Sequence, residues 1–186
     1  GGRSPADLLI TNAKLVDVLT GEIRETDVSV GGGKILGFSH TEAVKVVDAQ
    51  GAYLLPGLID AHIHIESSMV SPARFAGLVL PHGTTSVVAD PHEIANVHGL
   101  EGIRYMLENG RHLPLNIFIS LPSCVPATPF EDSGAILSAE ELEELIDDPK
   151  VTGIGEMMNF PGVVSGDYDV LAKIQLGTSH GKIVDG

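Results

Sequence analysis

Two histidines separated by a single residue are the strongest chemical signal in the sequence. His62 and His64 end an apolar segment, residues 58–64, that is typical of a β-strand. Side chains alternate along a strand, so both imidazoles are expected to project from the same face. Two neighbouring neutral imidazoles can bind one divalent metal ion, although an isolated pair of this kind is more often simply exposed or hydrogen-bonded.

Carboxylates follow two of the predicted strands at their carboxyl ends. Glu66 lies in a polar loop directly after the histidine pair, and Glu156 ends a predicted strand over residues 151–156. A carboxylate at the end of a buried parallel strand is costly unless it is paired or bound to a metal ion. The alternatives are a solvated loop carboxylate for Glu66 and an exposed rim position for Glu156.

A third group of polar residues ends the strand predicted over residues 84–90. Asp90, His92 and Glu93 lie within four positions of one another, and all three are residue types that bind metal ions or polar substrates. They are candidates for substrate binding or for a second metal site. Asp90 could instead cap the helix that follows it.

The elements that must position these residues divide the chain into two regions, 1–56 and 57–186. In the first, short strands and glycine-containing turns leave no room for helices, which predicts a small β-sandwich or sheet. In the second, strands and helices alternate, which predicts parallel strands joined by right-handed crossovers. The order is compatible with an open sheet or with half of a barrel. The predicted strands lie near residues 58–64, 84–90, 115–120, 151–156 and 182–184.

Helices are predicted between these strands, over residues 72–82 and about 93–109, and after a capping box formed by Ser138 and Glu141. Enzymes built from βα units place catalytic groups at the carboxyl ends of the strands. We therefore expect His62, His64 and Glu156 to converge at one end of a single parallel sheet, with His92 at the same rim.

Composition narrows the range of partners. The 186 residues are 43% hydrophobic and 19% charged, which is a globular balance, and the formal net charge is −14. Such a charge argues against binding to nucleic acid or anionic membranes and is compatible with a small neutral substrate. The single cysteine, Cys124, excludes an internal disulfide and a cysteine-rich zinc site. No secretion signal or membrane-spanning run is recognisable, so a cytoplasmic protein is expected. A homo-oligomer is also expected, because half a barrel exposes two strand edges and an apolar sheet face.

Three motifs carry a resemblance to a known family. Residues 54–66, with Pro56-Gly57 and the two histidines, resemble the P-G-x-I-D-x-H-x-H motif of the metal-dependent amidohydrolase superfamily. The run from Asp90 to Asn96 (D-P-H-E-I-A-N) and the run from Gly155 to Asn159 (G-E-M-M-N) are similar to the adenine deaminase family within it. The resemblance covers nearly the whole chain.

This resemblance implies an α/β fold in which a small β-sandwich-like accessory domain precedes the first half of a (β/α)8 TIM barrel. It also implies a centre of two divalent ions, manganese, iron or zinc, in which His62 and His64 hold one ion and Glu156 bridges both. Glu156 and Glu66 are the implied catalytic residues, and Asp90, His92 and Glu93 remain candidates for substrate or second-site binding.

The implied reaction is hydrolytic deamination of adenine to hypoxanthine and ammonia by a metal-activated hydroxide. In the family, further ligands come from later strands, so this chain alone is expected to be inactive and its longer parent active. The alternatives are another amidohydrolase that acts on a cyclic amide, and a non-catalytic half-barrel that binds metal or self-associates.

Overall fold

A computed structural model describes residues 4–128 and 130–186 of the chain. Contacts divide the chain into two compact units, here called the first unit, which ends at Pro56, and the second unit, which begins at Gly57. Each is described by itself. None of the helices in the described part of the chain combines the length and the apolar character that crossing a bilayer requires.

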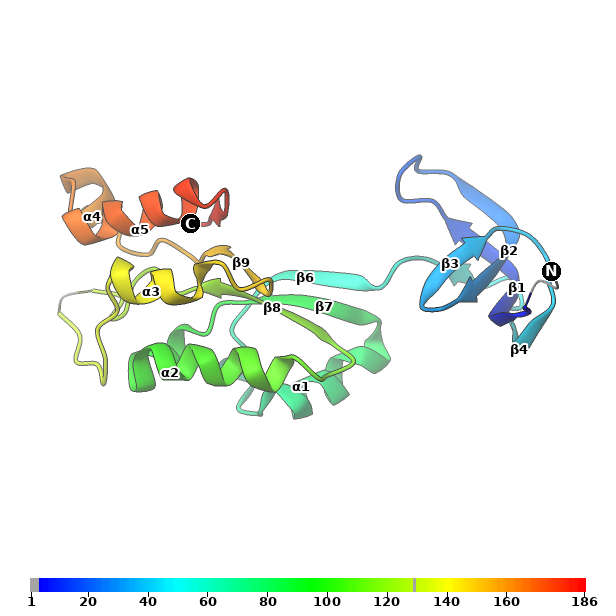
Figure 1. Ribbon diagram of the computed structural model, residues 1–186, viewed down its shortest axis with the longest axis horizontal. Coiled ribbons are helices and arrows are strands. Elements are labelled where there is room, and N and C mark those ends of the chain that lie inside the picture. Colours follow the sequence, from blue (N-terminus) through cyan, green and yellow to red (C-terminus); the bar gives the residue numbers. More distant parts are fainter. Residues whose placement is uncertain (1–3, 129) are drawn as a thin grey trace. The chain divides into compact units, whose positions relative to one another are not determined.

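The first unit is built on one mixed sheet of five strands (Figure 1). β1 pairs antiparallel with β2, and β2 antiparallel with β3, whereas β4 and β5 both run parallel to β1. The strands are β1 (Ala6–Val16), β2 (Ile23–Gly31), β3 (Lys34–Gly37), β4 (Ala43–Asp48) and β5 (Tyr53–Leu54). Residues 4–56 contain no helix, as the closely spaced turns predicted.

One difference from the sequence prediction lies in β1. The apolar runs 8–10 and 14–16 look like two strands in the sequence, but they belong to a single strand with a register shift between Ile10 and Ala13. Asn12 lies at this irregularity with a φ of 54°, a conformation that asparagine tolerates better than most residues. The irregularity interrupts the alternation of side chains without ending the pairing with β2.

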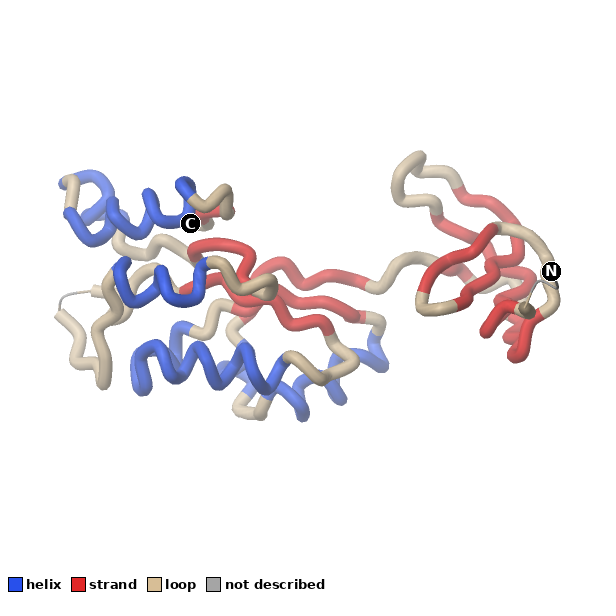
Figure 2. Tube along the Cα trace, viewed as in Figure 1, coloured by secondary structure: helices blue, strands red, loops and turns tan. Residues whose placement is uncertain are grey.

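The second unit contains a curled, fully parallel sheet of five strands whose spatial order, β10-β9-β8-β7-β6, follows the chain (Figures 1 and 2). The strands are β6 (Leu58–Ile63), β7 (Thr84–Ala89), β8 (Asn116–Leu121), β9 (Val151–Ile154) and β10 (Ile183–Val184). Neighbouring strands that are also consecutive in sequence are typical of a (β/α) barrel, and these five strands form half of one. The predicted fold class is confirmed.

Helices follow each of the first four strands of this sheet (Figure 2). They are η1 (Ile65–Ser68), α1 (Pro72–Val79), η2 (Leu80–His82), α2 (His92–Gly110), α3 (Ala139–Ile146), α4 (Phe160–Ser165) and α5 (Tyr168–Ser179). The capping box is confirmed, because the Ser138 hydroxyl accepts from the Glu141 N–H and the Glu141 carboxylate accepts from the Ser138 N–H. The sequence reading did not identify α4 and α5.

An apolar core joins the helices to the sheet of the second unit. α2 packs against β8, and α5 packs against β9 and β10. The fully buried side chains of this core include Ile65, Val87, Ile103, Ile119, Leu121, Leu142, Ile146 and Ile154. The strands are therefore held by apolar contacts, and the polar residues are concentrated beyond their carboxyl ends.

Candidate metal centre

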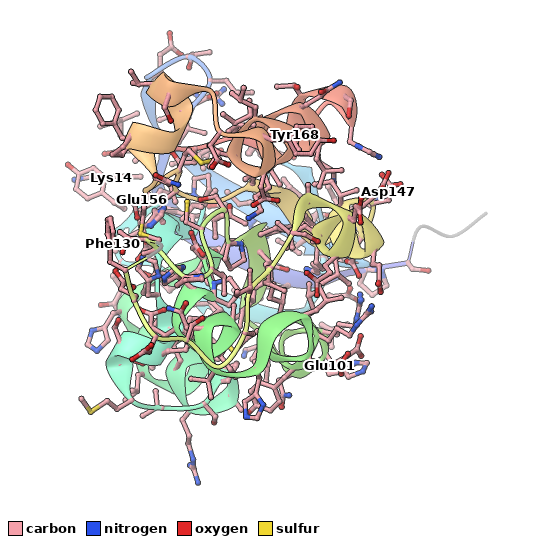
Figure 3. The ribbon with its side chains drawn as sticks, turned by 90° about the vertical axis from the view of Figure 1, so that its left-hand side faces the viewer. Lys14, Glu101, Phe130, Asp147, Glu156 and Tyr168 are labelled. Atoms are coloured by element: carbon pink, nitrogen blue, oxygen red, sulfur yellow. The ribbon has the colours of Figure 1, made fainter. Side chains whose placement is uncertain are left out.

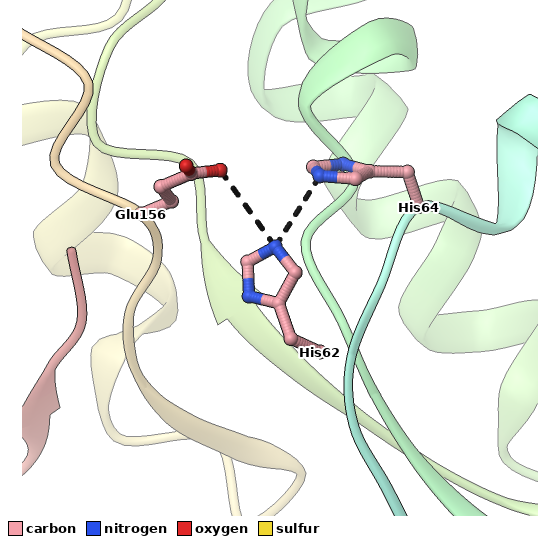
Figure 4. A group of neighbouring side chains, drawn as sticks. All are labelled: His62, His64 and Glu156. Atoms are coloured by element: carbon pink, nitrogen blue, oxygen red, sulfur yellow. Dashed lines mark hydrogen bonds and ion pairs between the residues drawn. The ribbon is translucent and has the colours of Figure 1, made fainter.

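The histidine pair lies where β6 ends. His62 is the penultimate residue of the strand, and His64 directly follows it as the N-cap residue of η1. Their Nε2 atoms are 3.3 Å apart, and the rings meet edge to face, with centroids 5.1 Å apart and planes at 73° (Figure 4). The two imidazoles therefore face one another across a small gap, as the alternation along the strand predicted.

Glu156 reaches the same place from a distant part of the chain. It lies two residues beyond the end of β9 rather than within the predicted strand, and its side chain is half-exposed (Figure 3). Its Oε2 atom is 3.7 Å from Nε2 of His62 (Figure 4). Nitrogen and oxygen atoms of all three side chains lie within 4.8 Å of one another, which is the expected convergence.

The remaining ring nitrogens have acceptors that favour one tautomer. Nδ1 of His62 is 3.3 Å from Oδ2 of Asp185, and Nδ1 of His64 is 2.9 Å from the main-chain oxygen of Asp90. A proton on each Nδ1 satisfies both acceptors and leaves each Nε2 as a lone-pair donor. The two Nε2 lone pairs then face each other, an arrangement that a cation between them stabilises.

The spacing of these atoms fits a metal ion. Two nitrogen ligands of a tetrahedral zinc ion, each about 2.0–2.1 Å from it, lie about 3.3–3.4 Å apart. The Nε2 atoms of His62 and His64 are separated by a matching 3.3 Å. The carboxylate of Glu156 adds an oxygen ligand of the kind that accompanies imidazole in zinc, iron and manganese sites.

Asp90 directly follows β7 and is 1% exposed. Its Oδ2 atom accepts a hydrogen bond from the backbone N–H of Glu156 at 3.2 Å. Burial raises the pKa of Asp90 to about 7. The helix-capping alternative is wrong, because the N-cap residue of α2 is Pro91 and the Asp90 carboxyl group bonds to the Glu156 N–H instead.

Glu93 and Glu66 lie on the same side of the second unit as His64. Oε2 of Glu93 is 3.4 Å from Nδ1 of His64, and its Oε1 accepts from the Ser67 hydroxyl at 3.1 Å. Glu66 is not a solvated loop carboxylate, because its Oε1 accepts from the N–H of Ile94 at 3.3 Å and burial raises its pKa.

His92 begins α2, two residues after Asp90, and burial lowers the pKa of its imidazole. Neither His92 nor Glu66 forms a hydrogen bond or ion pair with His62, His64 or Glu156 in the described part of the chain. The structure thus brings Glu93 and Asp90 into contact with the group formed by His62, His64 and Glu156. Glu66 and His92 do not form such a contact.

The polar groups around this centre are incompletely satisfied. Among the described residues, the buried side-chain atoms that lack a hydrogen-bond partner are Glu66 Oε2, Asp90 Oδ1, His92 Nδ1, Glu93 Oε2 and Asn96 Oδ1. A buried polar atom without a partner costs about 1–3 kcal/mol. All of these atoms belong to η1, to Asp90 directly after β7, or to the first five residues of α2. The cost is concentrated beside the candidate metal ligands, which is typical of a functional site.

Two residues near the centre were not predicted from the sequence. Asp185, directly after β10, pairs with His62, and its position after a predicted strand was the only available signal. Ser123 donates a hydrogen bond from its hydroxyl to the main-chain oxygen of Glu156. No pattern in the sequence distinguishes this serine from the others.

Comparison with known proteins bears on the whole chain. Residues 53–186 match the profile of the Amidohydrolase family. The adenine deaminase of Nitratidesulfovibrio vulgaris strain DP4 is 62% identical over 185 residues, covering 100% of this chain and 32% of that protein. The adenine deaminase of Halalkalibacterium halodurans is 52% identical over 187 residues, covering 99% of this chain and 32% of that protein. The chain thus spans about a third of the length of these curated relatives.

Solved structures show the same fold at low sequence identity. N-acyl-D-glutamate deacylase from Bordetella bronchiseptica, complexed with zinc and a phosphonate inhibitor, matches with a TM-score of 0.68 at 16% identity, over 97% of this chain and 44% of that one. A D-aminoacylase with a binuclear metal centre matches with a TM-score of 0.65 at 17% identity, over the same shares of the two chains. Since the family profile matches well over half of the sequence, the chain belongs to the amidohydrolase family.

Proposed function

We propose that the longer protein represented by this chain hydrolyses adenine to hypoxanthine and ammonia at a divalent metal centre that includes His62, His64 and Glu156. The convergence of these three side chains beyond the parallel strands is the observation that carries the proposal. The relatives that are 62% and 52% identical, both adenine deaminases, support the choice of substrate. We further propose that residues 1–56 form an accessory domain and residues 57–186 contribute half of the catalytic barrel.

The donor set supports manganese, iron or zinc as the bound metal. Neutral imidazoles and a carboxylate suit all three ions, and the zinc and binuclear centre in the structural neighbours are compatible with this choice. We propose that two ions would bind here and that Glu156 would help to hold both of them. When bound, a divalent ion lowers the pKa of a water molecule and so supplies a nucleophile near neutral pH.

The residues of the chain then orient the nucleophile and manage its protons. In the reaction, the water oxygen bonds to C6 of adenine, the bond from C6 to the exocyclic nitrogen breaks, and that nitrogen leaves as ammonia. One proton of the water ends on the departing ammonia and the other on N1 of the ring. We propose that Glu156 accepts a proton from the water. We propose Glu66 as the group that delivers a proton to the leaving nitrogen, because burial raises its pKa and one of its oxygens has no partner.

The test is ammonia release from adenine by the full-length gene product, supplied with manganese, iron or zinc in turn. The variant Glu156→Ala is expected to lose activity by about 10²–10⁴-fold, the range typical of a lost acid–base group. Glu101→Ala is the matched control, because Glu101 is 80% exposed on α2 (Figure 3) and is expected to retain full activity.

Two results would overturn the proposal. Turnover of a cyclic amide without turnover of adenine would identify a different amidohydrolase reaction. Tight metal binding with no turnover of either substrate would identify a non-catalytic metal-binding protein.

A further inference from the structure

We propose that Asp90 is a positioning residue that connects two of the candidate metal ligands, holding His64 through its main-chain oxygen and Glu156 through its carboxylate. The inference rests on the proposed metal centre and extends it. Asp90 lies between the two ligands in the sequence and directly follows β7, which the sheet order places between β6 and the strands that lead to Glu156. It can therefore contact both ligands at once.

The contact with His64 sets the tautomer of that ring. The main-chain oxygen of Asp90 accepts from Nδ1 of His64 at 2.9 Å, so the proton is held at Nδ1 and Nε2 is free to bind a cation. The backbone N–H of Asp90 donates to the main-chain oxygen of Ile63 at 2.9 Å. Asp90 is thus attached on both sides to the end of β6, immediately beside the histidine pair.

The contact with Glu156 orients the backbone from which the carboxylate ligand projects. Oδ2 of Asp90 accepts from the Glu156 N–H at 3.2 Å. Gly155 leaves the space for this contact, because a Cβ atom at position 155 would lie 2.3 Å from Oδ2 and 2.9 Å from Cγ of Asp90. Any larger residue at position 155 would push the Asp90 carboxyl off the Glu156 N–H.

A purely structural role for the Asp90 carboxyl group does not account for its environment. The side chain is almost fully buried, it does not cap α2, and its Oδ1 has no hydrogen-bond partner among the described residues. A buried carboxyl group with an unsatisfied oxygen lowers the stability of the fold. Its one side-chain hydrogen bond leads to a candidate metal ligand, so we assign its function to the geometry of that ligand.

The test measures zinc and cobalt affinity of the full-length gene product by competition with a chelator, together with the visible spectrum of bound cobalt. Asp90→Ala is expected to weaken affinity about 10–100-fold, the range for residues that orient metal ligands, and to alter the cobalt spectrum. Asp90→Asn keeps an oxygen acceptor for the Glu156 N–H and is expected to retain affinity within about 3-fold, since hydrogen-bond geometry is preserved.

A second variant addresses the same contact from the other side. Gly155→Ala is expected to weaken metal binding as Asp90→Ala does, and the double variant is expected to be no weaker than Asp90→Ala alone, because both changes remove one contact. Gly77→Ala is the control, since a Cβ atom at Gly77 meets nothing within 4 Å. Circular dichroism in the presence of chelator verifies folding, and Gly155→Ala carries the test if Asp90→Ala does not fold.

The outcomes separate the two proposals. Unchanged affinity and an unchanged spectrum in both Asp90→Ala and Gly155→Ala would overturn the positioning role while leaving the metal centre intact. Equal losses in Asp90→Asn and Asp90→Ala would also overturn it, because charge and not the hydrogen bond would then matter. If the unsubstituted full-length protein binds neither ion, the metal centre itself is wrong.

Discussion

Each unit of the molecule contains a histidine paired with an aspartate, and the two pairs differ in their surroundings. In the first unit, Nδ1 of His40 is 3.0 Å from Oδ2 of Asp27, and the His40 side chain is 76% exposed. In the second unit, Nδ1 of His62 is 3.3 Å from Oδ2 of Asp185, and the His62 side chain is 36% exposed. Among the residues that the structure describes, only the second pair has another imidazole and another carboxylate beside it.

The direction of the strands explains this difference. In the first unit β1, β2 and β3 alternate in direction, so the residues that follow them are divided between two edges of the sheet. In the second unit all strands are parallel, so the polar residues after β6, β7, β9 and β10 meet at one edge. A histidine–aspartate pair thus becomes part of a candidate site only where parallel strands bring further ligands to it.

The largest expected effect is on metal binding. His62→Ala is expected to weaken zinc affinity of the 186-residue chain by more than about 100-fold, because loss of a direct ligand exceeds the 10–100-fold effect of residues that only orient one. His40→Ala is expected to leave zinc affinity unchanged, since none of the described residues supplies a second metal ligand beside His40. Competition with a chelator measures the zinc dissociation constants of both variants. Equal effects of the two substitutions would show that the histidine of the second unit is no more a metal ligand than that of the first.

An effect of comparable size is expected on the stability of each unit separately. Leu142 is fully buried in the core of the second unit, and Leu142→Ala is expected to lower its free energy of unfolding by about 2–5 kcal/mol. Leu9→Ala is expected to act on the first unit by the same mechanism. Exposed Leu78→Ala serves as control, with a change within about 0.5 kcal/mol.

Hydrogen exchange measured by mass spectrometry, resolved by peptide, assigns each loss to a unit. The expectation is faster exchange confined to the unit that carries the substitution. If Leu142→Ala accelerates exchange in β1 as much as in β8, the two units unfold together and cannot be compared as independent bodies.

The smallest expected effect is a difference between the two units in how their free energy of unfolding depends on pH. Burial lowers the pKa of His92 in the second unit from 6.5, so its contribution to stability is present above about pH 6.5 and is lost as the pH falls through the folded-state pKa. In the first unit, hydrogen bonds from the N–H groups of Leu19 and Thr20 lower the pKa of Asp17 from 3.8. The contribution of Asp17 is therefore lost only at more acidic pH.

The difference in pH dependence is tested with the variant His92→Asn, whose free energy of unfolding is measured with chelator present. Asp90 acts in the opposite direction, because burial raises its pKa to about 7 and its contribution is lost as the pH rises through that value. The prediction therefore concerns the free energy of unfolding of the unsubstituted chain minus that of His92→Asn. For the second unit this difference should decrease between pH 7 and pH 5. For the first unit the two chains should not differ. A constant difference over this range would contradict it.

Most strands of the second unit were predictable, because their apolar runs are bounded by glycine, proline or charged residues. The predicted strand over 84–90 corresponds to β7 at Thr84–Ala89, and the one over 115–120 to β8 at Asn116–Leu121. α4 and α5 were missed because α4 is short and the hydrophobic pattern of α5 is weakly one-sided. Their local signals were the caps Asn159 and Asp167, whose side chains accept from N–H groups three residues later.

The candidate ligands were visible in the sequence as residue types, whereas the groups that orient them were not. Because imidazole and carboxylate groups are common metal ligands, His62, His64 and Glu156 are candidate ligands by residue type alone. The acceptor for His64 is a main-chain oxygen, which every residue possesses, so no pattern marks Asp90 for that role. Asp185 is 123 positions from His62 and is brought to it only by the curvature of the sheet.

The sequence by itself determined the class of the fold, the succession of strands and helices, and the chemical types available at their ends, because these depend on local periodicity and on side-chain identity. Only the tertiary structure decided which ring nitrogens keep their protons, and that Glu156 lies within 3.7 Å of His62. Both depend on contacts between residues that are separated by 26 to 123 positions in the sequence and that the parallel, curled sheet brings together. No local pattern encodes such a distance, since it is set by how five strands pack side by side.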